Sequence, residues 1–398
     1  MDAIPAVTPL VWYATLALIG GLLAFDFFFH VRRAHAPTLR ESTLWSSLYI
    51  AVALLFGVAV LVFGGSEMGQ EYFAGYVTEK ALSVDNLFVF LVIFASFKVP
   101  REDQQKALLF GIVFSLIARG AFIAIGATLI NYFSWVFYIF GLVLLFTAGH
   151  LLAPQEDEED RADNIMIRLA RRVFHTSTDY DGDRLFTVVE GRRVMTPMVL
   201  VMAAIAGSDI LFALDSIPAI FGLTESGYVV FTATAFSLMG LRQLYFLIDG
   251  LLDRLVYLSY GLAAILGFIG VKLVLHALHT NTLDFINDGE HVDVIEISTG
   301  LSLAVIVCVL LVTVVASLVS PRGRALSAIN SARRHALLYL AMDHSIGAAE
   351  REAVYRRMLE AEHAMQAMPE RYRRMIKEPV ALELALEQAH RHHERLGD

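Results

Sequence analysis

The sequence has little cysteine, little charge and no nucleotide-binding motif. Cys308 is the single cysteine among 398 residues, so an intramolecular disulfide is excluded and cysteine content says nothing about the compartment. No GxxxxGK[ST] motif occurs, which argues against an ATP site of the P-loop type. Charged residues make up 18% of the chain and hydrophobic residues 57%, with a mean hydropathy of +0.59. This composition is too apolar for a soluble fold and predicts a membrane protein.

Long hydrophobic runs are abundant. A window of about 19 residues gives about nine candidate transmembrane helices. They cover residues 8–29, 44–63, 71–97, 107–130, 133–153, 196–222, 228–249, 255–278 and 298–319. No basic region precedes the first run, and Arg32 and Arg33 follow it, so we expect a retained helix and not a cleaved signal peptide. The fold class predicted is therefore an all-α polytopic membrane protein.

Basic residues indicate the orientation of these helices. If the loops alternate between the two sides, one side receives Arg32, Arg33, Arg40, Lys98, Arg101, Lys106, seven arginines between residues 161 and 193, Arg254 and the basic tail. The positive-inside rule makes that side cytoplasmic, with the N-terminus outside, the C-terminus inside and the plasma membrane as the location. Asp26, near the cytoplasmic end of the first helix, is either an interfacial anchor or part of an ion path.

Ionisable residues also lie within the membrane-spanning runs. The third run contains Glu79, Lys80, Asp85 and Asn86, and the sixth contains Asp209, Asp215 and Ser216. Both follow one spacing, in which two acidic residues six positions apart precede a small polar residue. A charge at membrane depth costs at least a few kcal/mol, so it usually pairs, faces a wet cavity or binds an ion.

Residues 71–153 and 196–278 share an ordered set of features that predicts two inverted three-helix repeats. After the acidic pair, FSLIAR ends at Arg119 in the first segment and FSLMGLR ends at Arg242 in the second. The next run has a glycine nine residues before a histidine, at Gly141 and His150 and at Gly267 and His276. Transporters with inverted repeats bind substrate near the membrane midplane, where the repeats meet.

The remaining segments follow from this division. We expect a two-helix segment at 1–70, a cytoplasmic loop with turns or short β structure at 154–195, an acidic outer loop and ninth helix at 279–320, and a cytoplasmic helical tail at 321–398. The tail ends in HRHHER, which is either a metal-binding cluster or, with more weight, a basic surface cluster.

The acidic pairs do not share a helix face. Residues six apart on a continuous α-helix are about 120° apart around the axis and about 9 Å apart along it. If both members of a pair serve one site, the helix is broken, and Gly75, Ser83, Gly207 and Pro218 are available as breakers. Otherwise each pair marks two positions along a path.

The polar set offers hard oxygen ligands. Carboxylates, an amide and a hydroxyl suit Mn²⁺, Ca²⁺ or Mg²⁺ better than Zn²⁺ or Cu⁺. The predicted metal ligands are Asp85, Asp215, Asn86, Ser216, Glu79 and Asp209. The alternative is that four carboxylates neutralise four buried cations, Lys80, Arg119, Arg242 and Lys272. The two interpretations combine if Asp85 and Asp215 bind the ion while the basic residues support the empty site and bias protonation, so that cation entry and proton loss are coupled.

The segments EYFAGYVTEKALSVDNLFVF and FALDSIPAIFGLT closely resemble the TerC/Alx family of integral membrane proteins. The resemblance extends from about residue 25 to 320 and includes YIFGLVLLFTAGH and GLRQLYF. The family is named for tellurium resistance and is associated with manganese export. The resemblance implies metal-handling roles for Asp85, Asn86, Asp215 and Ser216, and it extends this role to Glu79 and Asp209.

This chain departs from the family pattern at two positions. Ala206 stands where many members have glutamate, and Thr234 stands where they have asparagine, and both changes remove an oxygen ligand. The metal therefore does not follow from the family alone.

Two hypotheses of function remain. The first is a secondary transporter that exports a divalent cation, Mn²⁺ before Ca²⁺ or Mg²⁺, with no catalytic cofactor and no nucleic acid partner. The second is a non-transporting membrane scaffold that delivers metal to exported proteins or organises resistance to tellurite or metal stress. An enzyme is not expected, because GSDI at residues 207–210 matches the GxGD motif of intramembrane aspartyl proteases poorly.

Overall fold

Helices make up most of the structure, as the hydrophobic runs predict. The computed structural model describes residues 7–31, 39–97, 99–152, 182, 184–189, 192–248, 255–281, 283, 286–342, 348–373 and 379–397. The first half contains α1 (Pro9–Asp26), a π-helix (Phe27–Val31), α2 (Leu39–Gly64), α3 (Ser66–Ser96), α4 (Arg101–Tyr132) and α5 (Val136–Leu152). The second half contains α7 (Pro197–Phe221), α8 (Gly227–Leu238), α9 (Leu241–Ile248), α10 (Leu258–His279), a 3₁₀ turn (Asn287–Gly289) and α11 (Thr299–Val319).

Seven stretches of the described residues are long and apolar enough to cross a membrane. They correspond to α1, α2, α4, α7, α8 together with α9, α10 and α11. By this measure α5 is a shorter apolar helix of 17 residues, and α3, which carries both acids and Lys80, is not among the seven. The multi-pass helical architecture is thus established, whereas nine spans and the N-out, C-in orientation stay predictions.

The seventh hydrophobic run is not one helix. The span predicted at residues 228–249 matches the apolar stretch Gly227–Leu247, but within it α8 ends at Leu238 and α9 begins at Leu241. Gly240 between them has a φ of +77°, which a residue with a side chain rarely adopts. Hydropathy detects the apolar run but is insensitive to this turn.

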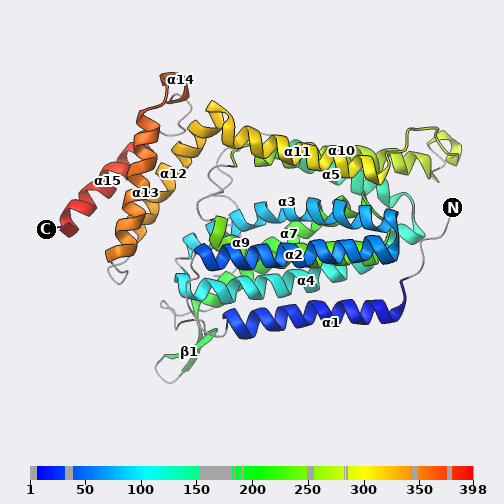
Figure 1. Ribbon diagram of the computed structural model, residues 1–398, viewed down its shortest axis with the longest axis horizontal. Helices are drawn as coiled ribbons and strands as arrows, with labels where there is room; N and C mark the ends of the chain where they lie inside the picture. Colours follow the sequence, from blue (N-terminus) through cyan, green and yellow to red (C-terminus); the bar gives the residue numbers. More distant parts are fainter. Residues whose placement is uncertain are drawn as a thin grey trace. The chain divides into compact units, whose positions relative to one another are not determined.

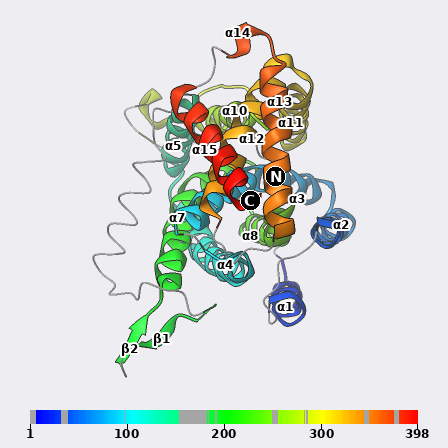
Figure 2. The ribbon, with the colours of Figure 1, turned by 90° about the vertical axis from the view of Figure 1, so that its left-hand side faces the viewer.

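Corresponding helices of the two predicted repeats lie side by side and run in opposite directions. Helix α3 contacts both α7 and α8, and α4 also contacts both. Figure 2 shows α8 between α3 and α4. Along α4 and α8, Gly120 lies near Phe231 and Ala127 lies near Gly227, so these two helices are antiparallel.

Helices α5 and α10 form a second antiparallel pair. Gly141 contacts Gly270, and Ala148 further along α5 lies near Gly267 earlier on α10. An added Cβ at Gly141 would stand 2.9 Å from the Gly270 carbonyl oxygen, so the glycines allow the two backbones to approach closely. Inverted repeats require such antiparallel pairs, although the repeat relation itself stays a prediction.

A β-hairpin precedes α7. Strands β1 (Phe186–Val189) and β2 (Arg192–Met195) pair antiparallel, with Phe186 opposite Met195. Thr196 closes the hairpin by donating from its hydroxyl to the Arg184 carbonyl at 2.5 Å. The short β structure expected in the 154–195 loop is therefore present, while most of that loop, including residues 153–181, lies outside the described residues.

The chain divides into two compact units. One comprises Met1–Leu247 and Leu262–Val309, and the other comprises Ile248–Gly261 and Leu310–Asp398. In the first, α2, α3, α4 and α7 run alongside one another (Figure 1). The second contains α12 (Pro321–Ala341), α13 (Ala348–Gln366), α14 (Glu370–Arg373) and α15 (Pro379–Gly397). The tail is thus helical, as expected.

The histidines of the HRHHER segment are tied into the tail. The hydroxyl of Tyr339 lies 2.7 Å from His393 Nδ1, and that of Tyr355 lies 2.8 Å from His390 Nδ1. His390 Nε2 is in turn 2.9 Å from Glu362. These contacts connect α15 to α12 and α13 around the buried side chains of Met358 and Leu386. The histidines therefore serve packing between helices of the tail.

Candidate cation site

The helices that carry the acidic pairs are continuous. Helix α3 extends without interruption from Ser66 to Ser96, and α7 continues through Pro218 to Phe221. Glu79 and Asp85 therefore occupy different positions along and around α3, and the same holds for Asp209 and Asp215 on α7. The sequence left open either a broken helix with both acids at one site or two separate positions along a path. Because both helices are continuous, each acidic pair marks two separate positions.

Glu79 and Arg119 form an ion pair at the interface of α3 and α4. Both side chains are fully buried. Asn86, about two turns further along α3, accepts a hydrogen bond from Arg119 Nη2 at 3.1 Å and donates to the Leu82 carbonyl at 3.1 Å, when its amide is oriented to satisfy both groups. A buried guanidinium thus connects two of the predicted ligands.

Asp209 of α7 faces the same guanidinium. It is 2% exposed and lies within electrostatic range of Arg119, with the Ser115 hydroxyl of α4 nearby. Its Oδ2 oxygen is buried without a hydrogen-bond partner among the described residues. Arg119 therefore stands among Glu79, Asn86 and Asp209, and one cation faces two carboxylates.

Asp215 has different surroundings. It accepts a hydrogen bond from the Thr147 hydroxyl of α5 at 2.9 Å and lies within electrostatic range of His150. The neighbouring Ser216 hydroxyl is buried and has no hydrogen-bond partner among the described residues. No lysine or arginine in the described chain pairs with Asp215.

Asp85 is partly buried on α3, and within the described ranges its carboxylate forms no hydrogen bond or ion pair. Asp85 and Asp215 are thus the two predicted ligands whose charge no buried lysine or arginine neutralises. The interpretation that all four carboxylates serve as ion-pair partners holds for Glu79 alone, with Asp209 sharing its arginine.

Arg242 has a partner that the sequence did not indicate. It donates to Asp26 from Nη2 at 2.8 Å and from Nε at 3.1 Å, and it also contacts Gln105. Gln243 Nε2 and the Tyr49 hydroxyl donate to the same carboxylate at 2.8 and 3.1 Å. Arg242 therefore anchors α9 to the end of α1, and Asp26 is a buried ion-pair partner.

Lys80 and Lys272 also lie apart from Asp85 and Asp215. Lys80 Nζ donates to the carbonyls of Ser237 and Met239, at 3.0 and 3.5 Å. Lys272 of α10 lies within electrostatic range of Glu71, which accepts a hydrogen bond from Thr224 at 2.7 Å.

Between α7 and α8, Glu225 contacts His276 Nε2 at 3.2 Å, and this hydrogen bond lowers the pKa of the Glu225 carboxyl. Carboxylates thus continue from the buried cluster toward the end of α7 that is predicted to face outward.

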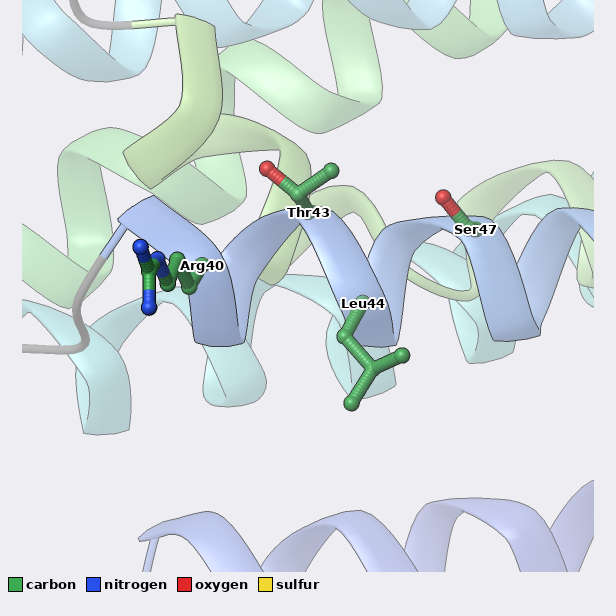
Figure 3. Close-up of a pocket in the computed structure, with 4 residues that line it drawn as sticks. All are labelled: Arg40, Thr43, Leu44 and Ser47. Carbon is green, nitrogen blue, oxygen red and sulfur yellow. The ribbon is translucent and has the colours of Figure 1, made fainter.

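The described residues contain no group of three or more His, Cys, Asp or Glu side chains placed to hold a metal ion. A surface hollow of about 440 Å³ lies on α2, lined by Arg40, Thr43, Leu44 and Ser47 (Figure 3), and none of the predicted ligands borders it. The acidic residues are therefore distributed among the helices and do not form one closed coordination shell. The six-ligand metal site stays a prediction.

These features define a polytopic helical membrane protein with carboxylates distributed through its interior. The chain belongs to the integral membrane protein TerC family, whose family model matches residues 64–325. The resemblance noted in the sequence is thereby confirmed, and the tail beyond residue 325 lies outside the match.

Relatives include proteins of similar length. An uncharacterized membrane protein of Mycobacterium tuberculosis, Rv2723, is 57% identical over 368 residues, which covers 92% of this chain and 93% of the relative. An uncharacterized membrane protein of Myxococcus xanthus is 36% identical, covering 81% of this chain and 96% of that protein. The putative membrane-bound redox modulator Alx of Escherichia coli is also 36% identical, covering 67% and 86%. No solved structure matches the chain.

Proposed function

We propose that this protein is a secondary transporter that exports a divalent cation across the plasma membrane, with Mn²⁺ as the first candidate and Ca²⁺ or Mg²⁺ as alternatives. The observation that carries the proposal is the unequal pairing of the buried acids. Glu79 has an arginine, whereas Asp85 and Asp215 have no lysine or arginine partner in the described chain. A carboxylate kept at membrane depth without a cationic partner is typical of an ion path.

Oxygen chemistry supports a hard cation as the substrate. Thr147 offers a hydroxyl oxygen at Asp215, and the sequence neighbours Ser216 of Asp215 and Asn86 of Asp85 offer a hydroxyl and an amide oxygen. Such ligands suit Mn²⁺, Mg²⁺ and Ca²⁺. Because the described acids are spread over several positions, the proposal is a path in which the cation is bound by few protein ligands at a time and keeps part of its hydration shell.

Exchange against protons follows from the same groups. An acid at membrane depth is more easily protonated when no cation neutralises it, so cation entry releases protons and cation departure takes them up. Arg119, between Glu79 and Asp209, would hold those two carboxylates together when no substrate is bound. In this scheme Asp85 and Asp215 bind the substrate, while Glu79 and Asp209 belong to the supporting charge network.

Flux in proteoliposomes tests the proposal. We expect the purified protein to move Mn²⁺ into vesicles with an opposing proton gradient, and Asp85→Asn and Asp215→Asn to reduce the rate at least about tenfold, since each removes a charged ligand worth more than about 1.4 kcal/mol. Asp293→Asn, at an exposed position of the outer segment, is the matched control and should keep the parent rate. Parent-like flux in both site variants would contradict the site assignment, and a rate independent of the proton gradient would contradict the exchange.

A non-transporting scaffold is the second candidate, and the lack of a three-ligand group in the described residues favours it. The word redox in the name of the Alx relatives points the same way. A chain with one cysteine cannot cycle between a dithiol and its own disulfide, so a redox effect would act through metal supply or a partner. If the parent protein transports none of Mn²⁺, Ca²⁺ or Mg²⁺ in the same vesicles, the scaffold is favoured.

A further inference from the structure

The interruption between α8 and α9 leaves backbone groups without helical partners. Helix α8 ends at Leu238, and Gly240 turns the chain with a φ of +77°. The side chain of Tyr49 fills the space beside the turn, because an added Cβ at Gly240 would lie 2.9 Å from Tyr49 Cβ. The turn is thus held in place by α2, and the last carbonyls of α8 have no amide ahead of them.

One lysine donates to one of these carbonyls and to the carbonyl of the residue that follows the helix. Lys80 Nζ donates to Ser237 O and Met239 O, and α3 and α8 pack against each other along this stretch. Backbone polar groups at membrane depth cannot be left to water, so interrupted helices are tolerated where another group satisfies them. The ammonium of Lys80 performs this role, and the partial negative charge at the C-terminus of α8 favours a cation there.

The hydrogen-bond partners of this ammonium among the described residues are two neutral carbonyl oxygens. Within the described chain, Lys80 forms no ion pair with a carboxylate. The hydroxyls of Thr234 and Ser237, on the last turns of α8, are fully buried and have no hydrogen-bond partner among the described residues. Ser237 thus supplies both a bound carbonyl and an unused hydroxyl, and Thr234 is one turn away on the same helix.

We propose that the interruption between α8 and α9 is a binding site for a hard monovalent cation of the Na⁺ or K⁺ class, and that the Lys80 ammonium occupies it as a tethered cation. Carbonyl and hydroxyl oxygens replace the hydration shell of alkali ions, and helix ends with freed carbonyls bind such ions in membrane proteins. Two carbonyl oxygens and the C-terminus of a helix carry only partial negative charges, so without a carboxylate they suit a cation with a single positive charge. The site is separate from the acids discussed above, and it does not depend on transport of a divalent cation.

Removing the lysine tests the site directly. Lys80→Ala should leave the carbonyls and hydroxyls without a cation, and Na⁺, K⁺ or methylammonium should then replace it. The purified variant would be heated in detergent with each chloride salt at one ionic strength, with choline chloride as the reference, and unfolding followed by tryptophan fluorescence and size-exclusion chromatography. We expect at least one small cation to raise the midpoint of Lys80→Ala by several degrees over choline, and to leave the parent protein unchanged.

Controls separate this effect from general salt stabilisation. Lys106→Ala removes a lysine from α4 and leaves the interruption intact, so it should show no preference for a small cation over choline. Adding Thr234→Val and Ser237→Ala to Lys80→Ala should weaken the preference, because the two hydroxyls are lost.

If Lys80→Ala folds poorly, the yield of monodisperse protein after extraction in each salt becomes the measurement. Lys80→Gln, which keeps one donor for the carbonyls, serves as a second variant. The proposal is overturned if, for Lys80→Ala and also for Lys80→Gln, the midpoint and the yield in every small cation are no higher than in choline.

Discussion

The Asp26 carboxylate accepts hydrogen bonds from Arg242, Gln243 and Tyr49, although the chain separates it from Arg242 by 216 residues. Its side chain is 8% exposed. An isolated carboxylate at such a position would lose its hydration without compensation. Three donor residues from α2 and α9 supply that compensation, so the buried carboxylate at the end of α1 forms a structural joint that connects these three helices.

Replacing one partner of this joint should be more harmful than replacing both. Arg242→Met removes the guanidinium that donates twice to this buried carboxylate, and we expect the free energy of unfolding to fall by about 3–5 kcal/mol. The double variant Asp26→Asn, Arg242→Met removes both charges and should unfold closer to the parent protein. Thermal unfolding of the purified proteins in detergent measures both, and equal losses in the single and double variants would contradict the interpretation.

The sequence located buried polar positions better than it located their partners. Glu79 is fully buried and pairs with an arginine, and Asp85 on the same helix is partly buried. The partner of Arg242 was not predictable, because Asp26 lies outside both repeats and pairing across more than 200 residues depends on tertiary packing. A buried acid in the first hydrophobic run was the available signal.

At the scale of the elements, the ends of the hydrophobic runs lie within six residues of the ends of the helices. Helix α7 was expected at residues 196–222 and spans Pro197–Phe221. What the runs could not show is where a helix is interrupted. Gly207 and Ser208 lie inside the continuous helix α7, whereas Gly240 makes a turn, because the outcome depends on packing against α2 and on Lys80.

The crossing of α5 and α10 depends on glycine. Gly141→Ala would place a Cβ 2.7 Å from Val274 Cγ2 and 2.9 Å from the Gly270 carbonyl oxygen, so the two helices must separate. We expect a loss of about 1–3 kcal/mol in the free energy of unfolding. Gly149→Ala on the same helix is the control, because nothing lies within 4 Å of the added atom and alanine favours helix. Equal midpoints for the two variants would contradict the close crossing.

For the whole molecule, the number of membrane crossings is the open prediction. The charged helix α3 and the 17-residue α5 decide between nine crossings and the seven that length and composition support. With the predicted orientation, in which the N-terminus is outside, two crossing helices would place the turn at Pro100 in the cytoplasm and the turn at Ser134 outside. If neither crosses, the two positions exchange sides, while the same orientation places the hairpin before α7 in the cytoplasm in both cases.

Cysteine labelling of intact cells distinguishes these topologies, and the single native cysteine makes the background simple. In a Cys308→Ser background, we expect Ser134→Cys to react with a membrane-impermeant maleimide and Pro100→Cys to react only after permeabilisation. Leu185→Cys in the hairpin is the cytoplasmic reference under either topology. The reverse pattern at Pro100 and Ser134 would establish seven crossings and would remove the basis for inverted repeats.

The ion pair between α1 and α9 also sets a condition on how the chain is made. At about 5–20 residues per second, a ribosome needs roughly 10–40 s to add the residues between Asp26 and Arg242. During that interval the Asp26 carboxylate lacks its hydrogen bonds to Arg242, so this connection between α1 and α9 cannot yet form. Docking of α1 is therefore a late event in biogenesis, completed only after the seventh hydrophobic run has emerged.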